Sequence, residues 1–575
     1  MHFRNVLISL TLSFFLIQSL YSQQLNLTDS INERVEKVSA EEFRIYPLND
    51  TRQMLKFKSS LYSFGNELVN SGLFLTDESF SIDGMNVRGI DYLPQMWSSD
   101  IRIHPDFGNG VSAYSPAGKY DFKTDPPSDV KFFNAEFRGS LHSIQSSIVF
   151  ADKIRKHEDD SKPIEVFLSG SSRLNFDGGP SFVDNVSMSL LTEDGLSLSP
   201  LYQQGESSNP EFKTEITGAE GLESNTYVLN TQQRDLKLYG KIKIPLSGSM
   251  NINVQSLYSV EKGKIDVFEN RLFNYMNNPD FRKNYFDGRI TFDHLAVNNA
   301  NLKLKYQLGV GYDNAWAHQE NEKYGKDFFR YCYIGSYTEH KEKAYDYYSS
   351  GGQYTYVMNG FATTGVDFTP GSLNPGLATY INQIWASGPS DPYTLLSFQN
   401  GYLPGNTSAG WSNYEVPVTY YSQQQSSRIN INGSANVETG NSKLSFGFDY
   451  RNDIYRNTIK NTARLYSQMR NELNSHISQL DLDHPMEEII DGNTYITYNR
   501  LYDGEIQTEF DRNLRVKLGL PVDGTEYILI DSYDYDKNTI KYYDHNSQLQ
   551  TLQLTNRLFS VDLFDPVDLL QNADT

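Results

Sequence analysis

Apolar and polar residues alternate along the chain from about residue 128 onward, in segments of roughly 9–11 residues joined by connections of uneven length. One segment carries apolar residues on one face and mostly charged residues on the other: Leu236, Leu238, Ile242, Ile244 and Leu246 against Lys237, Tyr239, Lys241 and Lys243. Segments of this length suit a tilted crossing of a bilayer, whereas strands of soluble proteins usually have about five or six residues. The alternation therefore predicts a mainly β chain and favours a (partial) antiparallel transmembrane β-barrel over a soluble all-β fold.

Short turns join several of these segments into hairpins. Ser247–Ser249 supplies turn residues directly after the first segment, and a second segment extends over residues 302–312. A further hairpin is predicted between residues 429–437 and 444–450, with its turn at Glu438–Lys443. Short turns of this kind connect neighbouring antiparallel strands.

The connections between the hairpins are long, rich in tyrosine and poor in such strands: residues 313–350, 359–427 and 452–550. Short turns at one end of the strands and long loops at the other are typical of outer-membrane barrels, whose long loops are extracellular. Inside these connections we expect a hairpin of Tyr527–Asp531 with Ile540–Tyr543, and a helix over Thr462–Leu480, where apolar residues recur at every fourth position.

The composition narrows the class of protein. Acidic residues number 71 against 50 basic ones, and the net charge of −21 excludes nucleic-acid binding as a global property. The single cysteine, Cys332, excludes a disulfide framework, and after residue 22 no apolar run reaches the ~18 residues of a membrane helix. The chain is polar on average yet contains 40 Tyr, 33 Phe and 4 Trp. A membrane β-barrel combines these properties, and a secreted all-β protein also can.

The first 22 residues have the features of a secretory signal peptide. Arg4 provides a positive charge, Val6–Ile17 is an apolar stretch, and Leu20 and Ser22 suit the positions before a cleavage site. A buried helix or a membrane anchor is the alternative, but the apolar run is shorter than a membrane span. We therefore expect residues 23–40 to be a short periplasmic segment of a protein of a Gram-negative outer membrane.

The sequence offers no enzyme motif: HExxH, GxSxG, a Walker loop and paired CxxC are all absent. Asp534-x-Asp536-x-Asn538 resembles the start of a calcium loop, but Thr539 replaces the required glycine, and a solvated acidic turn is the favoured interpretation. A polar loop is likewise favoured over a metal site for Asp481 and its neighbours Asp483 and His484. We predict a non-enzyme, assign no catalytic, cofactor-binding or metal-binding residue, expect no cofactor, and leave the ligand-binding residues unknown.

Residues 74–127 differ from the rest of the chain in being rich in glycine, serine and aspartate. The distinctive pieces are Phe80–Met85, Leu93-Pro94, Asp100–Ile103, Phe107–Tyr114 and Asp121–Thr124. Together they resemble the plug domain of TonB-dependent receptors of the Bacteroidota type. In that family a strand with an Asp-Gly turn precedes a Leu-Pro loop, an alternating Ile/Val strand, a G-x-x-S-A-x-Y turn and a closing strand.

Shorter pieces elsewhere resemble the same family. Val35–Glu42 is similar to its first plug strand and helix, and Arg271–Tyr275 and Asp562–Leu570 are similar to loops of its barrel. The resemblance implies a plug over residues 41–127 and barrel strands with long extracellular loops over 128–575. It also implies uptake of an extracellular ligand driven by the TonB–ExbB–ExbD complex, with a surface lipoprotein as a further partner and contact with outer-membrane lipid.

The chain departs from the family pattern at several places. The nearest candidate for a TonB box is Leu25–Thr28, which matches poorly, and residues 128–575 hold about ten to twelve strand candidates where about 22 are implied. We therefore expect the barrel to be incomplete at its C-terminal side; a smaller barrel with large loops is the alternative. Two other functions stay open: a passive or structural outer-membrane barrel without TonB coupling, and a secreted all-β hydrolase with carboxylates brought together in space.

Overall fold

A computed structural model describes residues 131–571 except 141, 155–162, 177–184, 203–210, 226, 351, 389–390 and 441, and the backbone of short strands between residues 36 and 123. The predicted signal peptide, residues 1–22, and the TonB-box candidate Leu25–Thr28 lie outside the described residues. Among the described residues, no helix is long and apolar enough to cross a membrane.

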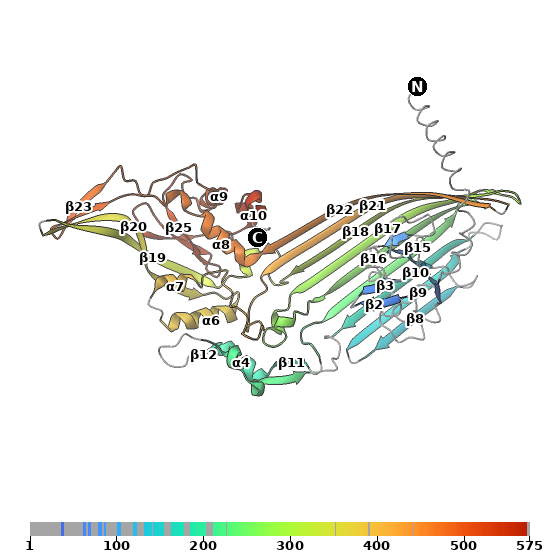
Figure 1. Ribbon diagram of the computed structural model, residues 1–575, viewed down its shortest axis with the longest axis horizontal. Helices are drawn as coiled ribbons and strands as arrows, with labels where there is room; N and C mark the ends of the chain where they lie inside the picture. The colour runs from blue at the N-terminus through green and yellow to red at the C-terminus, as the bar shows by residue number, and fades with distance from the viewer. Residues whose placement is uncertain are drawn as a thin grey trace, which may run out of the picture.

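A long, curved antiparallel sheet of nine strands dominates the molecule, with the order β22-β21-β18-β17-β16-β15-β10-β9-β8 (Figure 1). Its strands are β8 (Phe132–Gly139), β9 (Ser143–Ile154), β10 (Ile164–Asn175), β15 (Gln233–Pro245), β16 (Met250–Lys264), β17 (Asp280–Asn298), β18 (Lys303–Glu320), β21 (Tyr420–Thr439) and β22 (Ser442–Asn461). Within the described residues β8 and β22 are its two edges. The structure confirms the prediction of a mainly β chain built on a partial antiparallel barrel wall.

The predicted hairpins are present. β15 and β16 pair around the turn at Ser247–Ser249, and β21 pairs with β22. The second turn is tighter than predicted: Thr439 pairs with Ser442, because Gly440 adopts a φ of +54° that side chains rarely allow. Several strands are also longer than predicted, since β17 has 19 residues and β22 has 20. Backbone pairing between these strands extends past the last apolar positions and includes polar residues, which the alternation did not mark as strand.

Residues 321–419 and 462–571 overlap the long connections predicted at 313–350, 359–427 and 452–550. They fold together into a second body, which we call the loop body. Its elements are β19 (Gly335–Ser350), β20 (Gln353–Pro370), α6 (Pro375–Ala386), α7 (Pro392–Leu396), α8 (Thr462–Glu472), β23 (Met486–Ile490), β24 (Asn493–Thr497), α9 (Glu509–Leu518), β25 (Tyr527–Asp534), β26 (Thr539–Tyr543), β27 (Leu549–Gln553) and α10 (Pro566–Gln571). The predicted hairpin of β25 with β26 is confirmed. β19 and β20 show that the first two connections hold more strand than predicted.

The predicted helix over Thr462–Leu480 begins where expected but ends early. α8 stops at Glu472, Leu473 is extended, and Asn474 adopts a left-handed φ of +61°. The Asn474 side chain donates to the carbonyl of Ile528 and accepts from its amide, at 2.8 and 3.1 Å. This tertiary contact explains why the four-residue periodicity does not continue as helix.

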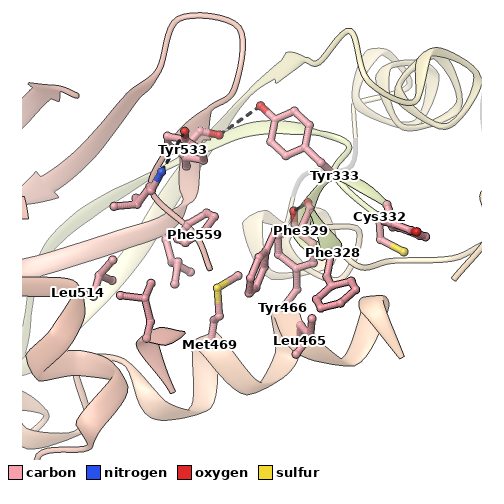
Figure 2. Close-up of a cluster of buried hydrophobic side chains, with 14 of the residues drawn as sticks. Phe328, Phe329, Cys332, Tyr333, Leu465, Tyr466, Met469, Leu514, Tyr533 and Phe559 are labelled. Carbon is pink, nitrogen blue, oxygen red and sulfur yellow. Dashed lines mark hydrogen bonds between the residues drawn. The ribbon is translucent and has the colours of Figure 1, made fainter. Parts of the chain in front are cut away.

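A core rich in aromatic residues holds the two segments of the loop body together (Figure 2). Phe329, from the first segment, is buried against Tyr466, Phe559 and Phe564 of the second. The hydroxyl of Tyr466 donates to the carbonyl of Phe329. The many tyrosines of the loops thus serve largely as core residues with a satisfied polar end.

Smaller elements complete the fold. The connection between β10 and β15 holds β11 (Asn185–Met188), α4 (Leu190–Leu198), β12 (Leu201–Tyr202), β13 (Glu211–Phe212), α5 (Lys213–Ile216), η2 (Ala219–Gly221) and β14 (Leu222–Asn225). Further 3₁₀ turns are η3 (Phe268–Asn270), η4 (Tyr275–Asn277), η5 (Phe328–Arg330), η6 (Ser475–Ile477) and η7 (Val561–Leu563).

A separate five-stranded sheet lies in the N-terminal region, with the order β1-β6-β7-β4-β5. Its strands are β1 (Glu36–Ser39), β4 (Ser79–Ile82), β5 (Met85–Val87), β6 (Asp100–His104) and β7 (Lys119–Lys123), and β2 (Leu61–Phe64) pairs with β3 (Glu67–Asn70) beside it in the sequence. β4 and β7 are parallel, and the other neighbours are antiparallel. The sheet thus combines the pieces singled out at Phe80–Met85, Asp100–Ile103 and Asp121–Thr124.

Candidate functional site

The nine-stranded sheet has two chemically opposite faces, and the first, which we call the outer face, is apolar and exposed. A single row across five strands shows this: Ile242, Val254, Ile290, Val310 and Ile431 are direct cross-strand neighbours. Their exposed fractions lie between 37% and 58%. Soluble proteins rarely expose so continuous an apolar surface, so this face is built to contact something other than water.

Aromatic residues lie at both ends of the apolar positions on the outer face. Near the short turns, the ring of Tyr306 lies 6.2 Å from that of Phe292 and 5.0 Å from that of His294. Toward the loop body, Tyr258 pairs directly with Phe286. Two aromatic borders around an apolar band are the arrangement that marks the interfaces of a membrane barrel.

The opposite face of the sheet, which we call the inner face, is polar and largely buried. Asp287, Arg289 and Asp313 expose only 4%, 5% and 4% of their side chains, and Asn253 and Gln255 are buried as well. Buried polar groups are costly unless they are hydrogen-bonded, and here many are. Asn253, for example, donates to Thr291 and Asp293 from one amide, at 3.1 and 2.6 Å.

Ion pairs connect neighbouring strands on the inner face. Arg428 on β21 lies 2.6 Å from Asp453 on β22 and 3.9 Å from Asp313 on β18. Other contacts lie within one strand: Arg451 pairs with Asp449 at 2.9 Å on β22, and the Tyr285 hydroxyl donates to Asp287 at 3.2 Å on β17. Alternating fixed charges of this kind can line an aqueous passage or hold a polar domain by complementary contacts.

A cluster of tyrosines covers the arm formed by β19, β20, β24 and β23, which projects away from the rest of the loop body (Figure 1). Tyr356 and Tyr495 stack with ring centroids 4.7 Å apart, and Tyr345 packs on Tyr495 at 5.5 Å. Tyr347 and Tyr354 are 67% and 41% exposed beside them. Exposed aromatic faces of this kind suit stacking on sugars or on a protein partner.

The residues weighed as metal ligands are engaged with the protein itself. Asp534 accepts from the backbone amides of Asp536 and Lys537, both at 2.9 Å, and the Asp536 carboxylate binds Ser372. The third residue of the motif, Asn538, donates to the carbonyl of Leu554.

The second candidate loop is similar. His484 hydrogen-bonds Asp481 on an exposed loop, at 2.9 Å. Among the residues that the structure describes, no group of three or more His, Cys, Asp or Glu side chains could hold a metal ion.

Comparisons with known proteins give only distant similarities. No protein-family model matches the chain, and no curated protein matches its sequence. Solved structures that it resembles include the ferric-catecholate import receptor Fiu of E. coli K12, with 9% identity and a TM-score of 0.33, over 74% of this chain and 60% of that one.

Two further solved structures show the same degree of similarity. The ferric preacinetobactin receptor BauA of Acinetobacter baumannii has 9% identity and a TM-score of 0.34, over 74% of this chain and 58% of that one. The alcaligin receptor FauA of Bordetella pertussis has 10% identity and a TM-score of 0.30, over 74% and 59%. The chain spans about 60% of the length of the first of these structures.

Proposed function

We propose that the chain forms the plug and part of the barrel of an outer-membrane receptor that takes up an extracellular ligand, rather than an enzyme. The observation that carries the proposal is the opposition of the two faces of the sheet. An apolar exposed outer face with aromatic borders suits lipid, and a polar buried inner face suits a filled lumen. The loop body at the end with the long connections is then extracellular.

A plug over residues 41–127 belongs to the same proposal. The mixed five-stranded sheet between residues 36 and 123 is a small polar unit that precedes β8, the first strand of the wall. A wide barrel needs such an internal stopper, and the buried charges of the inner face offer it complementary contacts. By its resemblance to the Bacteroidota type of receptor, release of the plug would be driven by the TonB–ExbB–ExbD complex.

The loop body provides the surface for ligand capture in this proposal. Its tyrosine arm presents Tyr347 and Tyr354 to the medium, where a glycan, a peptide or a surface lipoprotein would be held by stacking. The chemistry of the exposed residues is compatible with each of these ligands, so the substrate is left unspecified.

Fractionation tests the membrane part of the proposal. The full chain, expressed in a Gram-negative host, should be recovered in the outer-membrane fraction. Recovery as soluble protein from the culture medium would contradict it and favour the secreted hydrolase.

A pull-down tests TonB coupling. The full chain in detergent should be retained by an immobilised periplasmic domain of TonB, and a variant lacking residues 23–40 should not be. Outer-membrane location without retention would instead support the passive barrel.

A further inference from the structure

Four basic residues form a continuous row across the outer face, close to the loop body. Arg234 on β15 lies directly opposite Lys262 on β16, Lys262 opposite Arg282 on β17, and Arg282 opposite His318 on β18. Like charges placed directly opposite each other destabilise a sheet. The row of the three cations Arg234, Lys262 and Arg282 across three neighbouring strands therefore costs folding free energy unless something else neutralises it.

Two of the nearby carboxylates, those of Asp280 and Glu320, have partners other than Arg234, Lys262 and Arg282. Asp280 lies 2.8 Å from Lys264, and Glu320 lies 2.8 Å from His318. Among the described residues, no carboxylate lies within ion-pair distance of Arg234, Lys262 or Arg282. The one hydrogen bond of the Arg282 side chain goes to the neutral amide of Asn284, at 3.4 Å. Three cations of the row are thus available to an external anion.

The row borders a cavity rather than a flat surface. The cavity has a volume of about 420 Å³, and Arg234, Lys262, Arg282 and His318 line it together with Leu174. Lys264 and the acidic residues Asp280, Glu320 and Glu322 complete its charged lining. A volume of this size accommodates a phosphate group and part of the sugar that carries it. The apolar Leu174 lies on the outer face, opposite Arg234 in the neighbouring strand, and extends the apolar surface up to the cations.

The height of the row places it beside the membrane surface. Arg234 lies two residues beyond Leu236 along its strand, and Arg282 lies four residues beyond the aromatic border at Phe286. At ~3.3 Å per residue, the row lies roughly 7–13 Å beyond the apolar band. Lipid head groups lie at this height, directly above the acyl chains that cover the apolar face.

From this juxtaposition we propose that the row Arg234–Lys262–Arg282 binds the phosphate of a phosphorylated glycolipid in the outer leaflet. The sugar occupies the cavity, and the acyl chains lie along the apolar outer face below it. Guanidinium and ammonium groups form charge-assisted bonds with phosphate, which relieves the mutual repulsion of the row. This lipid is thereby a specific ligand of the nine-stranded sheet and not only part of the surrounding bilayer.

Titration of the full chain in neutral detergent with diphosphoryl lipid A tests this proposal. A variant combining Arg234→Gln, Lys262→Gln and Arg282→Gln should bind up to about a thousandfold more weakly, since three charge-assisted bonds of about tenfold each are removed. Arg456→Gln removes a cation from the outer face of β22, outside the row, and should leave the affinity unchanged. Equal binding by the triple variant and the wild type would overturn the proposal.

Two further probes distinguish the source of the anion. Lipid A stripped of its phosphates should bind the wild type at least tenfold more weakly, and inorganic phosphate in large excess should not displace the intact lipid. If inorganic phosphate displaced the intact lipid, the site would be one for free anions, and the proposal would be overturned. Equal binding of the lipid without phosphates would overturn it as well.

A stability measurement guards against misfolding of the variant. Without lipid, the triple variant should unfold at the same or a higher temperature than the wild type, because repulsion has been removed. A lower temperature would show that the row stabilises the fold by itself and would count against the proposal. The inference rests on the proposed membrane location, but lipid binding in detergent requires neither TonB nor the transported ligand, so its failure leaves the receptor proposal standing.

Discussion

The Nε atom of Arg515 lies 2.8 Å from the Oδ2 atom of Asp511 one turn earlier in α9, and both side chains are fully buried. Arg515 also binds the carboxylate and the carbonyl of Glu526, at 3.2 and 2.7 Å. This network connects α9 to the segment that leads into β25, so it supports the centre of the loop body.

Replacing Arg515 by methionine should destabilise the loop body by about 3–5 kcal/mol, because the Asp511 carboxylate would be left buried without its partner. The urea midpoint of the full chain in detergent, followed by tyrosine fluorescence, measures the change. Lys517→Met, on the exposed side of the same helix, is the matched control and should shift the midpoint little. Similar shifts for the two variants would contradict the assigned role of the pair.

His476 should make the loop body sensitive to acid. Its ring is buried, 3.5 Å from Asp511, and burial lowers the pKa of His476 below its ordinary value of 6.5, against the attraction of Asp511. The unfolded chain therefore binds a proton more readily than the folded one. The stability is fully present above pH 6.5 and declines as the pH falls through the lowered pKa.

The melting temperature between pH 7 and pH 5 measures this effect. The decline should be shallower in His476→Gln, which has no proton to accept at that position. His545→Gln, in the exposed turn between β26 and β27, should retain the slope of the wild type. An unchanged slope in His476→Gln would assign the acid sensitivity to other groups.

Cys332 should be unreactive in the folded protein. Its side chain is fully buried, its sulfur contacts the Thr462 hydroxyl at 3.3 Å, and burial raises the pKa of the Cys332 thiol to about 12. The thiolate is the reactive form, so Ellman's reagent should label the native chain negligibly and label one thiol per chain after denaturation. Rapid labelling of the native protein would show that the core of the loop body opens readily.

The cost in stability of a charged substitution on the outer face should depend on its depth in the membrane. Val310 belongs to the apolar row of the outer face, and a lysine there should cost about 2–4 kcal/mol in the membrane. Asn314, on the same face of the same strand but level with the aromatic border at Phe286, should accept lysine at a cost of about 0–1 kcal/mol.

The urea midpoints of Val310→Lys and Asn314→Lys after insertion into lipid vesicles provide the comparison. Equal midpoints would mean that the outer face does not contact hydrocarbon.

The wall could be predicted from the sequence because its determinants are local. Alternation with a period of two specifies which side chains share a face, and short turns such as Ser247–Ser249 specify which strands pair. The same alternation places Arg234, Lys262 and Arg282 on the outer face. Each lies an even number of positions from an outer-face residue of its own strand: Leu236, Tyr258 and Phe286 respectively. Their alignment into one row depends on strand register, which the turns alone did not define.

The loop body could not be predicted in the same way. Phe329 and Phe564 are stacked with their centroids 6.4 Å apart, although 235 positions separate their residue numbers. Contacts over such distances leave no periodic signal in either segment, and the tyrosine-rich stretches resembled solvated loops. The early end of α8 has the same origin, because Asn474 makes its hydrogen bonds to Ile528.

The shared core of the loop body has a consequence for the order of assembly. Residues 321–419 leave the wall at β18 and return to it at β21, so their ends are fixed as soon as these strands pair. The aromatic residues that they bring, Phe329 among them, find their partners only when residues 462–571 have arrived. The apolar side chains of residues 321–419 are therefore fully covered only after residues 462–571 have folded against them.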